Sequence, residues 1–176
     1  MKNKFFTLNA LIVTTLAFSI FSCGNKELSG TQDTALSDLQ SGAIIDLGVV
    51  SGDLHQMSVT LTNASIMMDG LKSAALARSL VYINLFTNSN GILNEGTYTY
   101  SNSDNYSTFT FKSGLIYMPN AVSNNYDQFA MNTGIMSIIR DGITYHITLE
   151  GTFSDGKSFH GSFLGQLSYS DTSVTY

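Results

Sequence analysis

The sequence predicts an all-β domain, an antiparallel sandwich or barrel with little helix. Apolar and polar residues alternate along 143–153 and again along 157–169, and a period of two is typical of a strand with one buried face. Glycine-containing turn sequences separate these runs. Tyr, Phe, Ile, Val and Thr dominate several shorter runs upstream, and these residue types favour strands.

The first 22 residues have the pattern of a secretory signal peptide. Met1–Lys4 is a basic tip, and an apolar run from Leu8 to Phe21 follows it. Polar residues interrupt this run, which is also shorter than the roughly 20 apolar residues of a membrane-spanning helix. We therefore expect residues 1–22 to be removed from the mature protein.

Cys23, the only cysteine, follows this run directly. With Ile20, Ser22 and Gly24 around it, the segment resembles the lipobox of bacterial lipoproteins, whose cysteine is acylated and becomes the new amino terminus. The resemblance implies attachment to a membrane through acyl chains on Cys23. Each buried methylene contributes about 0.8 kcal/mol to membrane binding, so several acyl chains give stable attachment. In bacteria that sort lipoproteins, an Asp directly after the acylated cysteine retains the protein at the inner membrane. Here that position is Gly24, so the resemblance implies a cell-envelope protein of the outer membrane.

Composition and charge limit the possible partners. The chain has 13 acidic and eight basic residues, with a formal net charge of −5. Without a basic cluster, we expect no nucleic acid partner and no electrostatic docking to anionic lipid. Acylation of Cys23 would also leave no thiol for a disulfide, a metal or a nucleophile.

Residues 23–42 are predicted to be the lipidated cysteine and a flexible tether, and 43–176 a single all-β domain. A flexible chain of this length spans roughly 25 Å. Within it, Asp33-Thr34-Ala35 resembles an acceptor motif for O-glycosylation in gut-type Gram-negative bacteria. The resemblance makes Thr34 a candidate acceptor, and a plain linker is the alternative.

The elements between residues 43 and 131 are short. Residues 69–79 are Ala-rich and suit either two turns of helix or an insertion loop. The polar segments 101–106 and 119–128 are predicted loops. The expected strands lie within 55–68, 79–88, 96–101, 107–111 and 113–118.

The last 45 residues predict a three-strand meander, with strands near 132–140, 143–153 and 157–169. A loop of Ser154-Asp155-Gly156 keeps both apolar sets on one face. It pairs Gly151 with Phe159, Leu149 with Gly161 and Tyr145 with Gly165, so three glycines lie opposite three large side chains, as suits a curved sheet. For the preceding hairpin, an Asp141-Gly142 turn pairs Arg140 with Ile143 and Ile138 with Tyr145.

The runs 96–101 and 143–169 resemble small all-β lipoproteins of the gut-type Gram-negative cell envelope. The resemblance covers roughly residues 43–170 and implies the same fold class and location. Many proteins of this kind have no assigned activity, so the resemblance implies no active site.

Candidate chemistry centres on Glu150 and His160, which the predicted register places side by side on the outward face. They suit either an acid–base pair of a hydrolase or a solvated ion pair worth up to about 1 kcal/mol. A hydrolase also needs a nucleophile, an oxyanion hole and a buried orienting carboxylate, and the sequence specifies none of these. No His or carboxylate spacing matches a metal site, so we expect no catalysis, no metal and no cofactor.

Two long loops rich in Asn, Ser and Tyr suggest binding instead, because function often lies on loops of a β scaffold. Tyr106 and Tyr126 are the candidate ligand contacts. The sequence therefore predicts a non-catalytic, lipid-anchored binding module for a glycan, a peptide or an envelope protein. The alternative is a structural component that pairs through a sheet edge, with 168–176 as the candidate strand.

Overall fold

The computed structural model describes residues 33–36, 38–63, 79–88, 92–103, 106–120, 123 and 125–171. Every regular element within these ranges is a strand, which confirms the all-β prediction. The strands are β1 (Thr34–Ala35), β2 (Ser41–Ser51), β3 (Leu54–Thr62), β4 (Leu80–Thr87), β5 (Gly96–Tyr100), β6 (Thr110–Asn120), β7 (Asn125–Asp141), β8 (Thr144–Phe153), β9 (Ser158–Gly165) and β10 (Leu167–Asp171).

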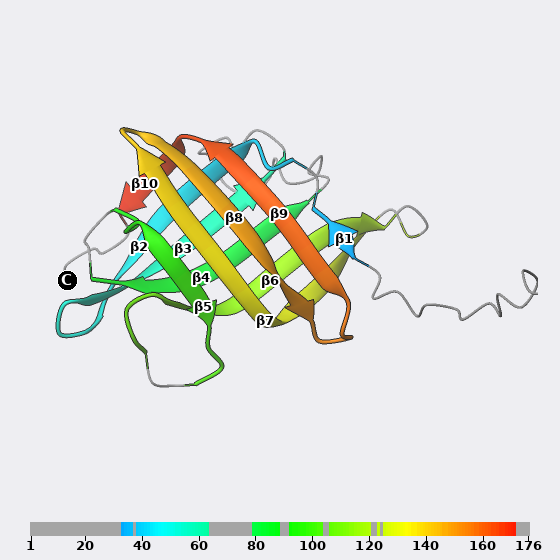
Figure 1. Cartoon of the computed structure of the whole chain (residues 1–176), viewed down its shortest axis with the longest axis horizontal. Coiled ribbons are helices and arrows are strands. Elements are labelled where there is room, and N and C mark those ends of the chain that lie inside the picture. The colour runs from blue at the N-terminus through cyan, green and yellow to red at the C-terminus, as the bar shows by residue number, and fades with distance from the viewer. Residues whose placement is uncertain are drawn as a thin grey trace, which may run out of the picture. The chain divides into compact units, whose positions relative to one another are not determined.

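These strands form one sheet that closes into a barrel, with further strands outside the closed ring. In Figure 1, β5, β7, β8 and β9 lie toward the viewer, and β2, β3, β4 and β6 cross behind them. Only Gln166 separates β9 from β10; β9 pairs with β8, whereas β10 pairs with β2. The continuous chain of β9 and β10 therefore connects the two ends of the sheet.

The barrel is mixed, whereas the sequence predicted antiparallel pairing throughout. β1 pairs with β9, β10 with β2 and β5 with β6 in parallel. Short hairpins specify only antiparallel neighbours. Parallel pairing between the first and last strands of a domain therefore leaves no local sequence signal.

Alternate side chains of the strands fill the interior. The aromatic rings of Phe153 and Phe159 stack there with centroids 4.7 Å apart, and Phe129 packs against Phe153 at 5.1 Å. Gly151 lies directly opposite Phe159, and a Cβ on Gly151 would lie 2.9 Å from the Phe159 ring. Large rings therefore occupy the space that the strand glycines leave open.

The predicted three-strand meander is present as β7, β8 and β9. In β8 and β9, Gly151 pairs with Phe159, Leu149 with Gly161 and Tyr145 with Gly165, as predicted. The register of the preceding hairpin was wrong by two residues, because the two-residue turn is Gly142-Ile143 and Arg140 pairs with Tyr145. Gly142 takes the positive φ of 60° at the first turn position, where glycine is favoured.

The predicted domain boundary at residue 43 is wrong, because the segment before it packs into the barrel. β1 lies along β9, and Leu39 forms a single parallel bridge to Phe163. The amide N–H of Leu36 donates to the carbonyl oxygen of His160 at 2.8 Å. Leu36 and Leu39 belong to the buried core, and the compact unit begins at Thr31. Residues 24–30 of the predicted tether precede this unit and lie outside the described residues, as do 31 and 32.

Two other predictions meet the limits of the described residues. The helix or insertion loop at 69–79 lies outside them except for Ser79. In the candidate edge strand 168–176, the described part belongs to β10 and pairs with β2, so this side of β10 is occupied within the chain. The described residues contain no helix long and apolar enough to cross a membrane.

Candidate functional site

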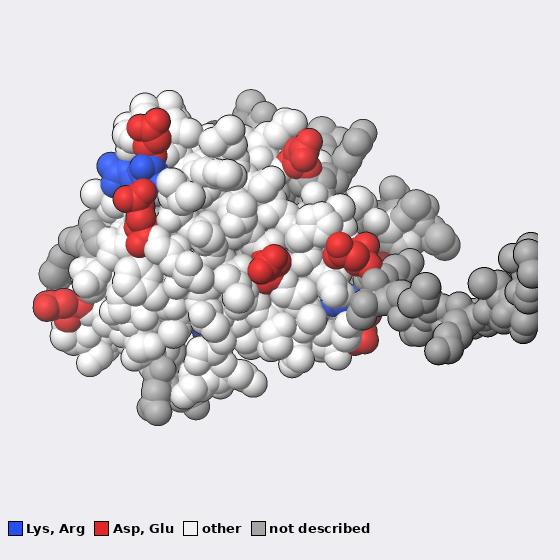
Figure 2. All heavy atoms as spheres, in the orientation of Figure 1, with Lys and Arg blue, Asp and Glu red and all other residues white. Residues whose placement is uncertain are grey.

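The outward side chains of β7, β8 and β9 form rows across the sheet, which we call the outer face. One row is Ile135, Glu150 and His160, and the next is Ser137, Thr148 and Ser162. On either side lie the rows Thr133–Thr152–Ser158 and Ile139–His146–Leu164. Hydroxyl rows thus alternate with rows that contain isoleucine, and Figure 2 shows few charged groups on this side of the molecule.

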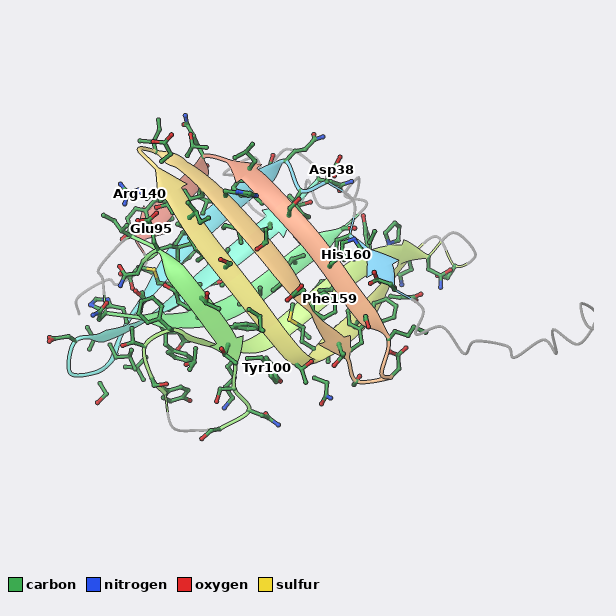
Figure 3. All side chains as sticks on the ribbon, viewed as in Figure 1. Asp38, Glu95, Tyr100, Arg140, Phe159 and His160 are labelled. Carbon is green, nitrogen blue, oxygen red and sulfur yellow. The ribbon has the colours of Figure 1, made fainter. Side chains whose placement is uncertain are left out.

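Two open hollows lie on the outer face. The larger, of about 850 Å³, extends from Thr99 and Tyr100 of β5 across β7 and β8 to His160. The smaller, of about 520 Å³, lies over Ser137, Thr148 and Ser162. Both are lined by Ile135, Glu150 and His160, so they adjoin along this row. Figure 3 shows Tyr100 and His160 on opposite sides of the barrel front.

A bend in the sheet underlies the larger hollow. The pairing of β7 with β8 shifts between Met131 and Thr133, which leaves Asn132 as a bulge. Gly134 and Gly151 face each other next to it. A Cβ on Gly151 would lie 2.2 Å from the carbonyl oxygen of Thr133, so the two backbones approach more closely than side chains allow. Bulge and glycines together let the sheet curve here.

The register prediction for Glu150 and His160 is confirmed, but the imidazole has another partner. His160 lies directly across from Glu150 in the sheet. Its Nδ1 lies 3.1 Å from the carboxylate of Asp33, a residue 127 positions earlier in the chain. The His160 and Asp33 side chains are 56% and 57% exposed. An ion pair so exposed contributes little stability. A hydrolase needs a buried carboxylate that orients its histidine, and the Asp33 carboxylate is not buried.

Tyr106 and Tyr126 do not lie together. Tyr106 precedes β6, where its ring packs against Phe86 with centroids 4.5 Å apart and the Nζ of Lys112 lies 5.6 Å from its ring centroid. Tyr126 pairs with Pro119 at the far end of β6. The 11 residues of β6 rise about 3.3 Å each, so its two ends lie roughly 33 Å apart. The predicted loop 119–128 is mostly strand, because β6 ends at Asn120 and β7 begins at Asn125.

The two predicted modification sites differ in what is described. Cys23 lies outside the described residues. Thr34 is half-buried in β1, where it pairs with Phe159 beside the Asp33–His160 pair. Its candidate O-glycosylation stays a prediction.

Two polar features were missed from the sequence. Asp46, buried in β2, lies 3.3 Å from Nδ1 of His55 in β3, and its Oδ1 accepts the N–H of Gly48 at 2.8 Å. Tyr98, buried in the barrel, donates to the carbonyl oxygen of Asn94 at 3.0 Å, and burial raises the pKa of its hydroxyl to about 12. The Asp46–His55 pair could have been predicted from the sequence, because both polar residues occupy inward positions of their strands.

The side chains of the described residues suit hydrogen bonding rather than metal binding. Within the described ranges, no three His, Cys, Asp or Glu side chains are grouped to hold a metal ion. The hydroxyls of Thr133 and Thr152, 2.8 Å apart, bond to each other on the outer face. The outer face can therefore donate and accept hydrogen bonds through side chains, chiefly hydroxyls.

No protein-family model, curated protein or solved structure matches the chain.

Proposed function

We propose that this protein is a lipid-anchored component of the bacterial cell envelope, at the outer membrane, and binds a neutral glycan on its outer face without transforming it. The observation that carries the binding proposal is the pair of adjoining hollows lined by Ser, Thr, Asn and Tyr side chains. Sugar hydroxyls both donate and accept hydrogen bonds, and so do the side chains of these rows.

The strand pairing favours a ligand recognised by side chains over a peptide added as a strand. β8 pairs with β7 on one side and β9 on the other, and β7 pairs with β5, β6 and β8. Their backbone groups are therefore committed within the sheet. A peptide that adds to a sheet needs a free edge, and the hollows lie over the middle of this one.

The size of the hollows favours a single extended chain over a folded protein. The rows under the hollows are three strands wide, with strands about 4.8 Å apart, and extend over six residues at about 3.3 Å each. Their area is therefore on the order of 300 Å². A stable protein interface needs about 800 Å² on each partner. A glycan chain lying across the rows needs far less area.

Charge favours a neutral ligand over an acidic one. Asp33, Asp38 and Glu150 line the hollows, and none of the described residues that line them is Lys or Arg. An anionic polymer would bring its charges next to carboxylates without a cation to pair with them. The edge of the larger hollow also presents Tyr100, an aromatic surface for a sugar ring.

The anchor in this proposal comes from the sequence. Residues 1–22 read as a signal peptide and Cys23 follows as the candidate acylated residue. The compact unit begins at Thr31, within about ten residues of Cys23, so acyl chains there would tether the barrel to the membrane.

Titration of a soluble form of the mature chain, carrying Cys23→Ala, tests the binding proposal. Neutral polysaccharides such as laminarin, dextran and xylan are compared with alginate, an anionic one. We expect at least one neutral polymer to bind and alginate not to bind. Thr148→Val and Ser162→Ala should each weaken that binding about two- to tenfold, the effect of losing one hydrogen bond of about 0.5–1.5 kcal/mol.

Ser168→Ala is the matched control, because Ser168 is exposed on β10 and outside both hollows. Binding that Ser168→Ala weakens as much as Ser162→Ala would place the glycan elsewhere. Preference for alginate, or no binding to any neutral polymer, would contradict the proposal.

A further inference from the structure

The two hollows of the outer face lie side by side and meet along one row of side chains. Both are lined by Ile135, Glu150 and His160, which we call the shared row. From there the larger hollow continues along β8 to Thr152, and the smaller continues in the opposite direction to Thr148. The shared row is therefore the border between two binding surfaces.

The longer dimension of the larger hollow runs across the strands. Its lining begins at Thr99 and Tyr100 on β5, continues over β7, β8 and β9, and ends at Asp33 just before β1. Figure 3 shows the strands that lie between Tyr100 and His160. Strands lie about 4.8 Å apart, so this lining spans on the order of 20 Å across the sheet. Along β7 and β8 it covers only three to four residues, roughly 7–10 Å. A linear glycan that fills the larger hollow therefore passes alongside the smaller one.

The smaller hollow is short. It ends at the row Ser137, Thr148 and Ser162, because no residue of the following row lines it. Two residues of strand, roughly 7 Å, separate this row from the shared row, a depth that takes about one sugar residue. The segment after β1 bounds the hollow on one side, where the N–H of Leu36 donates to the carbonyl oxygen of His160 at 2.8 Å.

We propose that the outer face recognises a branch point of a neutral glycan, an inference that rests on the proposed glycan binding. The backbone of the glycan lies in the larger hollow, and a short side branch crosses the shared row into the smaller hollow. A linear chain leaves part of the lining uncovered: along the strands it does not reach Tyr100, and across them it does not reach Ser162. A branched chain contacts the lining of both hollows at once.

The side chains of the shared row and its neighbours suit this arrangement. Ile135 is 45% exposed between two rows of hydroxyls. A branch-point sugar has fewer hydroxyls than its neighbours, because the branch linkage consumes one of them. The C–H groups of its ring can cover Ile135 and remove apolar surface from water. The neighbouring sugars keep more hydroxyls, and they lie over Thr152 and Thr148, whose side chains donate and accept hydrogen bonds.

Calorimetric titration with matched oligosaccharides tests the branch proposal on the mature chain that carries Cys23→Ala. Each pair shares a backbone and differs in its single-sugar branches. The pairs are cellotetraose and the xyloglucan heptasaccharide, mannopentaose and its galactosyl derivative, and xylotetraose and its arabinosyl derivative. We expect the branched member of at least one pair to bind about tenfold more tightly than the linear member, the effect of about two further hydrogen bonds.

Substitutions in the smaller hollow should reduce this preference. Thr148→Val and Ser162→Ala each remove a hydroxyl from the branch site, so each should weaken binding of the branched member about two- to tenfold and binding of the linear member less. Thr97→Val is the matched control, because Thr97 is exposed on β5 opposite Ser137 and lines neither hollow. It should leave the preference at its wild-type value.

The possible outcomes separate the branch proposal from the proposed glycan binding. Linear members that bind as tightly as their branched counterparts in every pair would overturn the branch proposal and leave glycan binding intact. Equal weakening of both members by Ser162→Ala, or loss of the preference in Thr97→Val, would also overturn it. Absence of binding to every neutral glycan would overturn both.

Discussion

Leu39→Ala tests whether the segment before β2 completes the barrel core. Leu39 is 4% exposed, forms the single bridge to Phe163, and its amide N–H donates to the carbonyl oxygen of Ser162 at 3.3 Å. Truncation of a buried leucine to alanine removes its burial and leaves a cavity, which costs about 2–5 kcal/mol. We expect the free energy of unfolding to fall by about 3 kcal/mol.

Urea unfolding followed by far-ultraviolet circular dichroism measures this effect, because the chain has no tryptophan for fluorescence. With a slope of about 1–3 kcal/mol per molar urea, the midpoint should fall by roughly 1–3 M. Leu164→Ala, at a leucine 69% exposed on β9, is the matched control and should change stability by less than about 0.5 kcal/mol. If Leu39→Ala behaves like Leu164→Ala, the segment before β2 is a tether and its packing against β9 does not complete the core.

Four further substitutions probe other parts of the account. Gly151→Ala should lower the free energy of unfolding by about 3 kcal/mol in urea titrations, because its Cβ would lie 2.2 Å from a backbone oxygen. Burial raises the pKa of Tyr98 to about 12; the tyrosine of the unfolded chain ionises first, so stability should be intact below about pH 10 and fall toward pH 12, and Tyr98→Phe should reduce that fall. Asp46→Ala should cost about 3 kcal/mol in thermal unfolding, because it leaves His55 beside a buried gap. His160→Ala should cost less than about 1 kcal/mol by the same assay, since its ion pair is exposed.

Each of these predictions has a control or a contradicting result. Gly52→Ala introduces a Cβ with no atom within 4 Å, so only its φ of 56° costs stability, about 1 kcal/mol. An unchanged alkaline profile in Tyr98→Phe would assign the fall to other tyrosines. Asp53→Ala, at an exposed carboxylate, should be nearly silent beside Asp46→Ala. A loss above about 2 kcal/mol in His160→Ala would show that its contacts matter more than exposed ion pairs usually do.

The meander shows what local pattern can and cannot predict. In β8 and β9, Gly151, Gly161 and Gly165 lie opposite large residues, and this size matching identified the register pair by pair. In β7 and β8, the predicted and observed registers differ by two residues, so both keep the same side chains on the same face. Periodicity cannot distinguish them, and the turn geometry at Gly142 decides.

Long-range pairing accounts for most of what the sequence left unpredicted. Leu36 and Leu39 are two leucines in a polar segment, too few to form a periodic pattern, and their partners lie in β9 more than 120 residues later. The same distance in sequence separates Asp33 from His160. Register therefore placed Glu150 beside His160, whereas the partner that the imidazole contacts came from a segment with no strand signal.

The loop-based site prediction was limited for the same kind of reason. Tyr106 and Tyr126 were grouped because both lie within polar segments predicted to be loops, but β6 runs between them. The outer-face hydroxyls were readable from the alternation of β8 and β9. The hollows above them depend on the Asn132 bulge and the Gly134–Gly151 contact, which involve pairing across strands.

The anchor is the claim on which the location of this protein depends, and the intact mass of the protein purified from bacterial membranes tests it most directly. The account predicts a chain that has lost residues 1–22 and gained the mass of several acyl chains, a gain that Cys23→Ala abolishes. A membrane-extracted chain with an unmodified Cys23 would contradict the envelope assignment and leave the barrel without its proposed attachment.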